Sequence, residues 1–152
     1  MNTYEITYDG NLRTSALHVD SAEMIHTDAP KDNEGLGESF SPTDLFCTAL
    51  GSCILTIMAI AARKKGIEIK GTTAFVKKTM RSNPRMIDQI DVVIHFVNDF
   101  DEKTKTVLER AAHKCPVHRS ISSKVKKNIV FRYLNLQLLV ITIMLSSSDF
   151  SI

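Results

Sequence analysis

The chain has 152 residues, of which 43% are hydrophobic and 24% charged, and its formal net charge is +2. This composition suits one compact domain with a hydrophobic core, and it argues against intrinsic disorder, a second domain or a polyanion-binding tail. We therefore expect no nucleic-acid partner. No targeting segment is evident and no stretch is expected to span a membrane, so the sequence predicts a cytoplasmic protein without membrane contact.

The first part of the chain predicts a β-hairpin, a loop and a helix. Residues 3–26 alternate in strand fashion and break at Asp9-Gly10, which favours a hairpin with an Asp-Gly turn. Residues 28–40 are rich in turn formers and predict a surface loop. The run Ser41-Pro42-Thr43-Asp44 then resembles a capping box that opens a helix reaching Gly66. This helix is apolar on nearly every side, so we expect its own sheet or a partner subunit to bury it all round.

The second part predicts two strands, two helices and a last strand. Residues 67–75 and 90–96 alternate as two antiparallel strands do. Asp101 opens an amphipathic helix that Pro116 ends, and a short helix follows with Cys115 as its N-cap. A strand is expected at 128–133. The order β-β-α-β-β-α-α-β predicts an α+β fold in which an antiparallel sheet surrounds one long buried helix.

We place the domain at residues 1–133 and treat residues 134–152 as a C-terminal extension of unknown role. The extension begins with mostly apolar residues and ends in a serine-rich run. An added edge strand, an oligomer contact and an appendage without a fixed place all agree with this pattern.

Three cysteines are too few for a secreted disulfide framework, so in a reducing compartment each is either a core residue or a reactive thiol. Cys47 is expected in the core. Cys53 also suits the core, since free cysteines are among the most buried residues, but Gly51 and Ser52 beside it would let a substrate or a second thiol approach. Cys115 precedes Pro116 at a predicted helix start, where unpaired N–H groups lower the pKa of a thiol.

Two histidines flank Cys115 and leave three interpretations open. His113 and His118 could assist the thiol as charge or base, could support acyl transfer by Cys115, or could be solvated side chains. A metal site is also conceivable for two imidazoles and a thiol, but no further cluster completes a ligand set. We expect no metal and no cofactor.

The motifs FSPTDLFCTALGSC (40–53) and AAHKCPVHRSI (111–121) resemble the OsmC/Ohr family of osmotically inducible and organic-hydroperoxide-resistance proteins. The resemblance covers residues 4–133 and is strongest to the OsmC-like branch. It implies an intertwined α+β homodimer and a thiol-dependent peroxidase acting on organic hydroperoxides. By this resemblance Cys53 is the peroxidatic thiolate, Cys115 resolves it, an external dithiol reduces the pair, and Arg13 of the first hairpin holds the thiolate. The family thus assigns the attack to Cys53, whereas the local sequence favours Cys115 as the more acidic thiol.

Thr43 is a departure from the family. The well-characterised branches carry a glutamate at this position, which orients the arginine, and Asp44 or Glu38 could replace it here. Positions 43 and 53 of one straight helix lie about 15 Å apart along the axis, too far for one arginine to serve both. Either Arg13 and the helix start assist Cys53 of the other subunit, or the helix entry bends. We expect the first, with a site at the dimer interface.

The sequence thus predicts a cysteine-based peroxidase with a Cys53/Cys115 redox pair and Arg13, acting in stress protection. The alternative is an OsmC-like dimer that senses redox state or binds a small ligand without turnover. The apolar helix predicts a dry pocket that prefers alkyl hydroperoxides over hydrogen peroxide.

Overall fold

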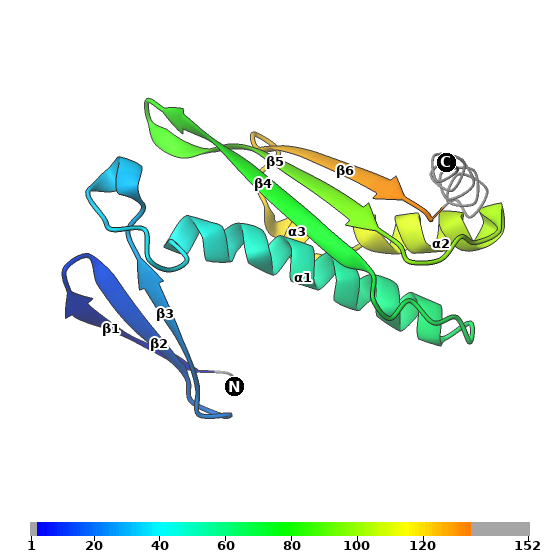
Figure 1. The fold of residues 1–152 in the computed structure, drawn as a ribbon, viewed down its shortest axis with the longest axis horizontal. Coiled ribbons are helices and arrows are strands. Elements are labelled where there is room, and N and C mark those ends of the chain that lie inside the picture. The colour runs from blue at the N-terminus through cyan, green and yellow to red at the C-terminus, as the bar shows by residue number, and fades with distance from the viewer. Residues whose placement is uncertain (1–2, 135–152) are drawn as a thin grey trace, which may run out of the picture. The chain divides into compact units, whose positions relative to one another are not determined.

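The computed structural model describes residues 3–134, which divide after Thr48 into two compact units. Each unit contains one three-stranded sheet, and the chain is of the mixed α+β class, as predicted (Figure 1). The fold departs from the prediction of a single antiparallel sheet, because the strands form two separate sheets. The predicted domain limits, 1–133 and 134–152, stay a prediction. The proposed extension lies outside the described residues except for Leu134.

The first unit contains an antiparallel sheet of β1 (Tyr4–Gly10), β2 (Arg13–His18) and β3 (Glu23–Asp28). The β1–β2 hairpin is confirmed, but its turn is formed by Asn11 and Leu12 at φ 52° and 62°, not by Asp9-Gly10. Positive φ at both central residues matches the right-handed twist of the strands. The third strand was not predicted. The loop after β3 is confirmed, with one short 3-10 helix, η1 (Lys31–Asn33).

The long helix α1 (Pro42–Arg63) begins in the first unit and continues into the second. The predicted capping box is present, with aspartate in place of glutamate. Asp44 accepts hydrogen bonds from the backbone N–H of Ser41 at 2.8 Å and from its hydroxyl at 2.7 Å, and the Asp44 N–H donates to the Ser41 hydroxyl at 3.2 Å. These contacts satisfy helix-end N–H groups that have no partner within the helix.

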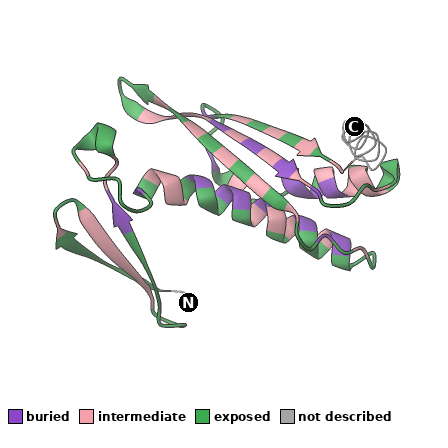
Figure 2. Cartoon of the chain, viewed as in Figure 1, coloured by how far each residue is buried: buried purple, intermediate pink, exposed green. Residues whose placement is uncertain are grey.

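The α1 helix is not buried on all sides by its own chain. The sequence predicted burial either by the chain's own sheet or by a partner subunit, and the first of these does not occur. Its fully buried residues form one stripe at spacings of three and four, while large apolar residues such as Phe46 and Ile60 are exposed (Figure 2). The sequence also predicted that no segment could span a bilayer, and this was wrong, because α1 is long and apolar enough to do so. The 22 residues of α1 reach a mean hydropathy of 2.2, with 33% of the window buried inside the chain. A core helix of a soluble protein meets the same criterion.

The second unit is built on the sheet β4 (Thr73–Ser82), β5 (Arg85–His95) and β6 (Lys126–Arg132), with β5 in the centre. The predicted β4–β5 pair is antiparallel, but β6 joins β5 in parallel, so this sheet is mixed. Ile90, Val92 and Ile94 of β5 are almost fully buried and form the core together with the α1 stripe. A Cβ at Gly51 of α1 would lie 2.8 Å from Val76 of β4, so the helix packs closely on this sheet.

Two helices of the second unit complete the core. The predicted helix after Asp101 is α2 (Glu102–His113), and the Asp101 side chain accepts the Thr104 N–H at 2.7 Å. Leu108, Ala111 and Ala112 are its buried residues. The short α3 (Pro116–Ser120) follows with Cys115 as its N-cap, as predicted.

Candidate functional site: a thiol pair and an arginine cluster

The thiols of Cys53 and Cys115 meet within the second unit. A side-chain hydrogen bond joins them, although one residue lies on α1 and the other at the start of α3. Both cysteines are reduced. Cys53 is half-buried, whereas Cys115 is fully buried. The pair therefore combines one thiol that solvent can reach with one that it cannot.

The pKa of Cys115 is raised, contrary to our prediction for a thiol at a helix start. Burial is the main cause, and the hydrogen bond with Cys53 and the charge of Cys53 act in the same direction. The His118 N–H donates to the Cys115 Sγ at 3.5 Å and opposes the shift. One such contact does not offset the cost of placing a thiolate away from water, so Cys115 is protonated at neutral pH.

The imidazole of His118, beside Cys115, supplies no positive charge of the kind that would stabilise a thiolate. The pKa of His118 is lowered by burial and then by Lys127 and His113, so this imidazole is neutral near pH 7. The two histidine rings lie edge to face with centroids 5.7 Å apart. No group of three or more metal-ligating side chains occurs among residues 3–134.

A groove runs between α1 and α2 in the second unit. Its volume is about 330 Å³, and its apolar lining includes Ile57, one turn beyond Cys53 on α1, and Ala111, shortly before Cys115 on the chain. Three cations, Lys64, Arg110 and Lys114, line the same groove. The groove thus suits a molecule with an apolar body.

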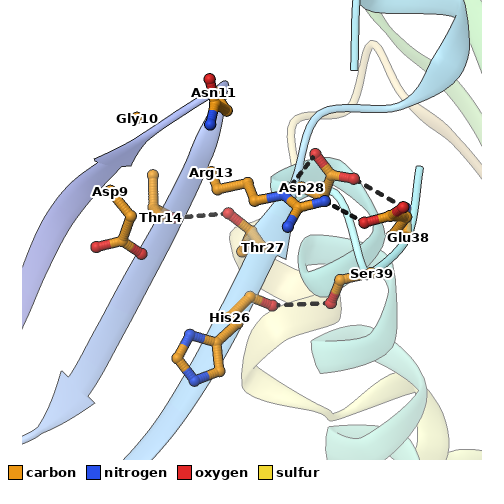
Figure 3. Close-up of a pocket in the computed structure, with 10 residues that line it drawn as sticks. All are labelled: Asp9, Gly10, Asn11, Arg13, Thr14, His26, Thr27, Asp28, Glu38 and Ser39. Carbon is orange, nitrogen blue, oxygen red and sulfur yellow. Dashed lines mark hydrogen bonds and ion pairs between the residues drawn. The ribbon is translucent and has the colours of Figure 1, made fainter. Parts of the chain in front are cut away.

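Arg13 lies in the first unit, in a cleft of about 440 Å³ (Figure 3). Its guanidinium Nη2 forms an ion pair with the Glu38 carboxylate, and its Nε lies 3.7 Å from Oδ1 of Asp28. Both acids raise the pKa of Arg13, so the guanidinium is charged. Of the two acids considered as substitutes for the glutamate missing at Thr43, Glu38 therefore contacts Arg13, while Asp44 caps α1.

Asp28 was missed in the sequence, although it is the buried partner of Arg13. Only 1% of its surface is exposed, and its Oδ2 accepts the Glu38 N–H at 2.8 Å. This hydrogen bond and the charge of Arg13 lower the pKa of Asp28, against the effect of burial. Arg13 and Asp28 are directly opposite each other on β2 and β3. The cross-strand register was the signal that could have found the pair, but β3 was not predicted.

Cys47 and Thr43 have the structural roles that their positions on α1 allow. Cys47 is 5% exposed, as expected for a core residue. The Thr43 hydroxyl lies 3.0 Å from the Ser41 hydroxyl at the helix start. Thr43 thus supplies no carboxylate at this position.

These features define an α+β protein with two reduced cysteines in contact and a separate apolar groove between α1 and α2. The chain belongs to the OsmC-like protein family, whose model matches residues 35–130. This membership suggests a role in redox or peroxide-stress chemistry.

Two solved structures and one curated relative are similar to this chain. A Psychrobacter arcticus protein, named for osmotic stress induction and a detoxification response, is 45% identical, with a TM-score of 0.84 over 87% of this chain and 96% of its own. The organic hydroperoxide resistance protein OsmC of Legionella pneumophila has the same fold at 13% identity, with a TM-score of 0.71 over 87% of this chain and 96% of its own. An uncharacterised protein of Methanocaldococcus jannaschii is 26% identical over 82% of this chain and 70% of its own.

Proposed function

We propose that the protein is a thiol-dependent peroxidase that reduces organic hydroperoxides through Cys53 and Cys115 in the cytoplasm. The observation that carries the proposal is the hydrogen bond between the two thiols. A disulfide requires the two sulfurs to approach closely, and the side chains of this pair already interact.

The different environments of the two cysteines support a different role for each in this proposal. Cys53 is the more exposed residue and meets the substrate. Its thiolate attacks the distal peroxide oxygen, the O–O bond breaks, and the alkoxide takes a proton and leaves as the alcohol. Cys53 is then a sulfenic acid. Cys115, still a thiol because its pKa is raised, condenses with it to a disulfide and releases water.

An external dithiol completes the cycle by two thiol–disulfide exchanges, which return both cysteines to the reduced state and oxidise the dithiol to its disulfide. Arg13 stabilises the Cys53 thiolate by its charge and thereby keeps it reactive. We propose that the working molecule is a homodimer and that Arg13 of one subunit serves Cys53 of the other. A partner subunit would also cover apolar residues of α1, such as Ile60, that its own chain leaves exposed.

The substrate is an alkyl hydroperoxide rather than hydrogen peroxide. The groove between α1 and α2 has an apolar lining that can receive an alkyl group, and hydrogen peroxide has no such group to bury.

The test is turnover of tert-butyl hydroperoxide, cumene hydroperoxide and hydrogen peroxide by the reduced protein with dihydrolipoamide or dithiothreitol. We expect faster turnover of both organic hydroperoxides, complete loss of turnover in Cys53→Ser, and a trappable sulfenic acid in Cys115→Ser. Cys47→Ser is the matched control and should retain activity. Oxidation of one equivalent without turnover by any dithiol would instead support the redox-sensing alternative.

A further inference from the structure

The acids around Arg13 differ in burial and in how firmly they are held. Asp28 is 1% exposed and its Oδ2 is fixed by the Glu38 N–H at 2.8 Å. The Glu38 side chain is 63% exposed and forms an ion pair with Arg13 (Figure 3). An exposed carboxylate can exchange its partner for water at little cost, whereas a buried carboxylate that loses its partner is left as an uncompensated charge.

Two buried atoms of this cluster lack a hydrogen bond. Within the described part of the chain, neither Arg13 Nε nor Asp28 Oδ1 has such a partner, and the two lie 3.7 Å from each other. Buried polar groups without partners are costly, and a shift of less than about 1 Å would turn this ion pair into an N–H···O hydrogen bond. A small movement of the guanidinium would therefore let Asp28 hold it more closely.

Backbone geometry fixes Asp28 opposite Arg13. The two residues are paired on β2 and β3, and the Asp28 N–H donates to the Phe40 carbonyl at 3.1 Å. Asp28 thus sits in a rigid part of the first unit, while Glu38 lies in the loop that precedes α1.

We propose that Asp28 is the positioning residue for Arg13, and that Glu38 is an exchangeable partner that Arg13 releases when it acts on the reactive thiolate. The inference rests on the proposed function, since it gives Arg13 a thiolate to stabilise. In this proposal Asp28, on β3, orients Arg13 in place of the glutamate that is absent at Thr43.

The experiment measures the pH profile of Cys53 alkylation by iodoacetamide in a Cys47→Ser/Cys115→Ser background, together with kcat/KM for cumene hydroperoxide in the full chain. Asp28→Asn and Glu38→Gln each remove one negative charge near Arg13. If both acids acted only by their charge, both variants would lower the pKa of Cys53, because Arg13 would be less neutralised.

A positioning role predicts opposite results. Asp28→Asn should raise the alkylation pKa toward that of Arg13→Ala and reduce kcat/KM by roughly tenfold or more, as expected when a catalytic group is misplaced. Glu38→Gln should leave the pKa unchanged or lower it. In an Arg13→Ala background, Asp28→Asn should have no further effect, since it acts through Arg13.

Circular dichroism and the melting temperature separate misplacement from unfolding, and Asp28→Glu, which keeps the charge, gives a second variant if Asp28→Asn does not fold. Its longer side chain should move Arg13 and also reduce kcat/KM. Equal pKa shifts in Asp28→Asn and Glu38→Gln, or additive losses with Arg13→Ala, would overturn the proposal. A wild-type protein without turnover would instead refute the peroxidase function.

Discussion

Cys115 hydrogen-bonds to Cys53, and this contact raises the pKa of Cys115. Burial of Cys115 is the larger cause of the same shift, and both effects favour the protonated form of its thiol. The buried cysteine is thus held as a thiol beside the half-buried one.

Addition of one equivalent of cumene hydroperoxide to the reduced protein should form a Cys53–Cys115 disulfide. The number of thiols titrated after denaturation should fall from three to one, since Cys47 is not part of the pair. Peptide mapping by mass spectrometry checks the linkage. A Cys47–Cys53 linkage, or one between subunits, would contradict this prediction.

The stability of the protein should fall at alkaline pH because of Cys115. Its pKa is higher in the folded than in the unfolded state, so its contribution to stability is fully present below the unfolded pKa of about 8.5 and is lost as the pH rises through the folded pKa. The melting temperature measured from pH 7 to pH 10 should decline less in Cys115→Ala. Burial raises the pKa of Tyr133 too, so a residual decline should remain at the highest pH.

Asp44→Ala should destabilise the protein without changing the peroxide chemistry. The substitution removes the hydrogen bonds to Ser41 at the start of α1, and loss of such a cap costs about 1 kcal/mol. Urea unfolding measures this cost. The kcat/KM of the folded variant should equal that of the wild type, because Asp44 serves the helix and not Arg13. A loss of activity without a loss of stability would reverse that assignment.

Gly51→Ala should destabilise the second unit, although alanine is the better helix former by about 1 kcal/mol. The new Cβ would lie 2.8 Å from Val76 Cγ2, and such overpacking costs about 1–3 kcal/mol. The double variant Gly51→Ala/Val76→Ala should recover part of the loss. Denaturant unfolding of the two single variants and the double variant gives the coupling energy.

The elements with strong local signals were predictable from the sequence. The α1 start has its capping residues, α2 has an apolar stripe and Asp101, and the alternation in 90–96 marks the centre of β5. The β3 strand lacks such a signal, because Met24 and Ile25 are adjacent and both about half exposed. Alternation also carries no information on strand direction, which is why the parallel pairing of β6 with β5 was missed.

The site could be predicted in part for the same physical reason. The contact of Cys53 with Cys115 agrees with the expected pairing. The higher pKa of Cys115 was not predictable, because burial depends on the packing of α1 and α2 around the sulfur and not on the residues next to it. Asp28 was missed because its partner is defined by strand register.

The pairing of Arg13 with Asp28 depends on the number of residues in the turn between β2 and β3. The turn covers residues 19–22, with Ala22 at φ 58°. Insertion or deletion of a single residue there would slide one strand past the other, and side chains would change faces with each step. A mutation in a solvent-exposed bend, far along the chain from either cysteine, would thereby disconnect the arginine from its buried acid while leaving every member of the cluster in the sequence.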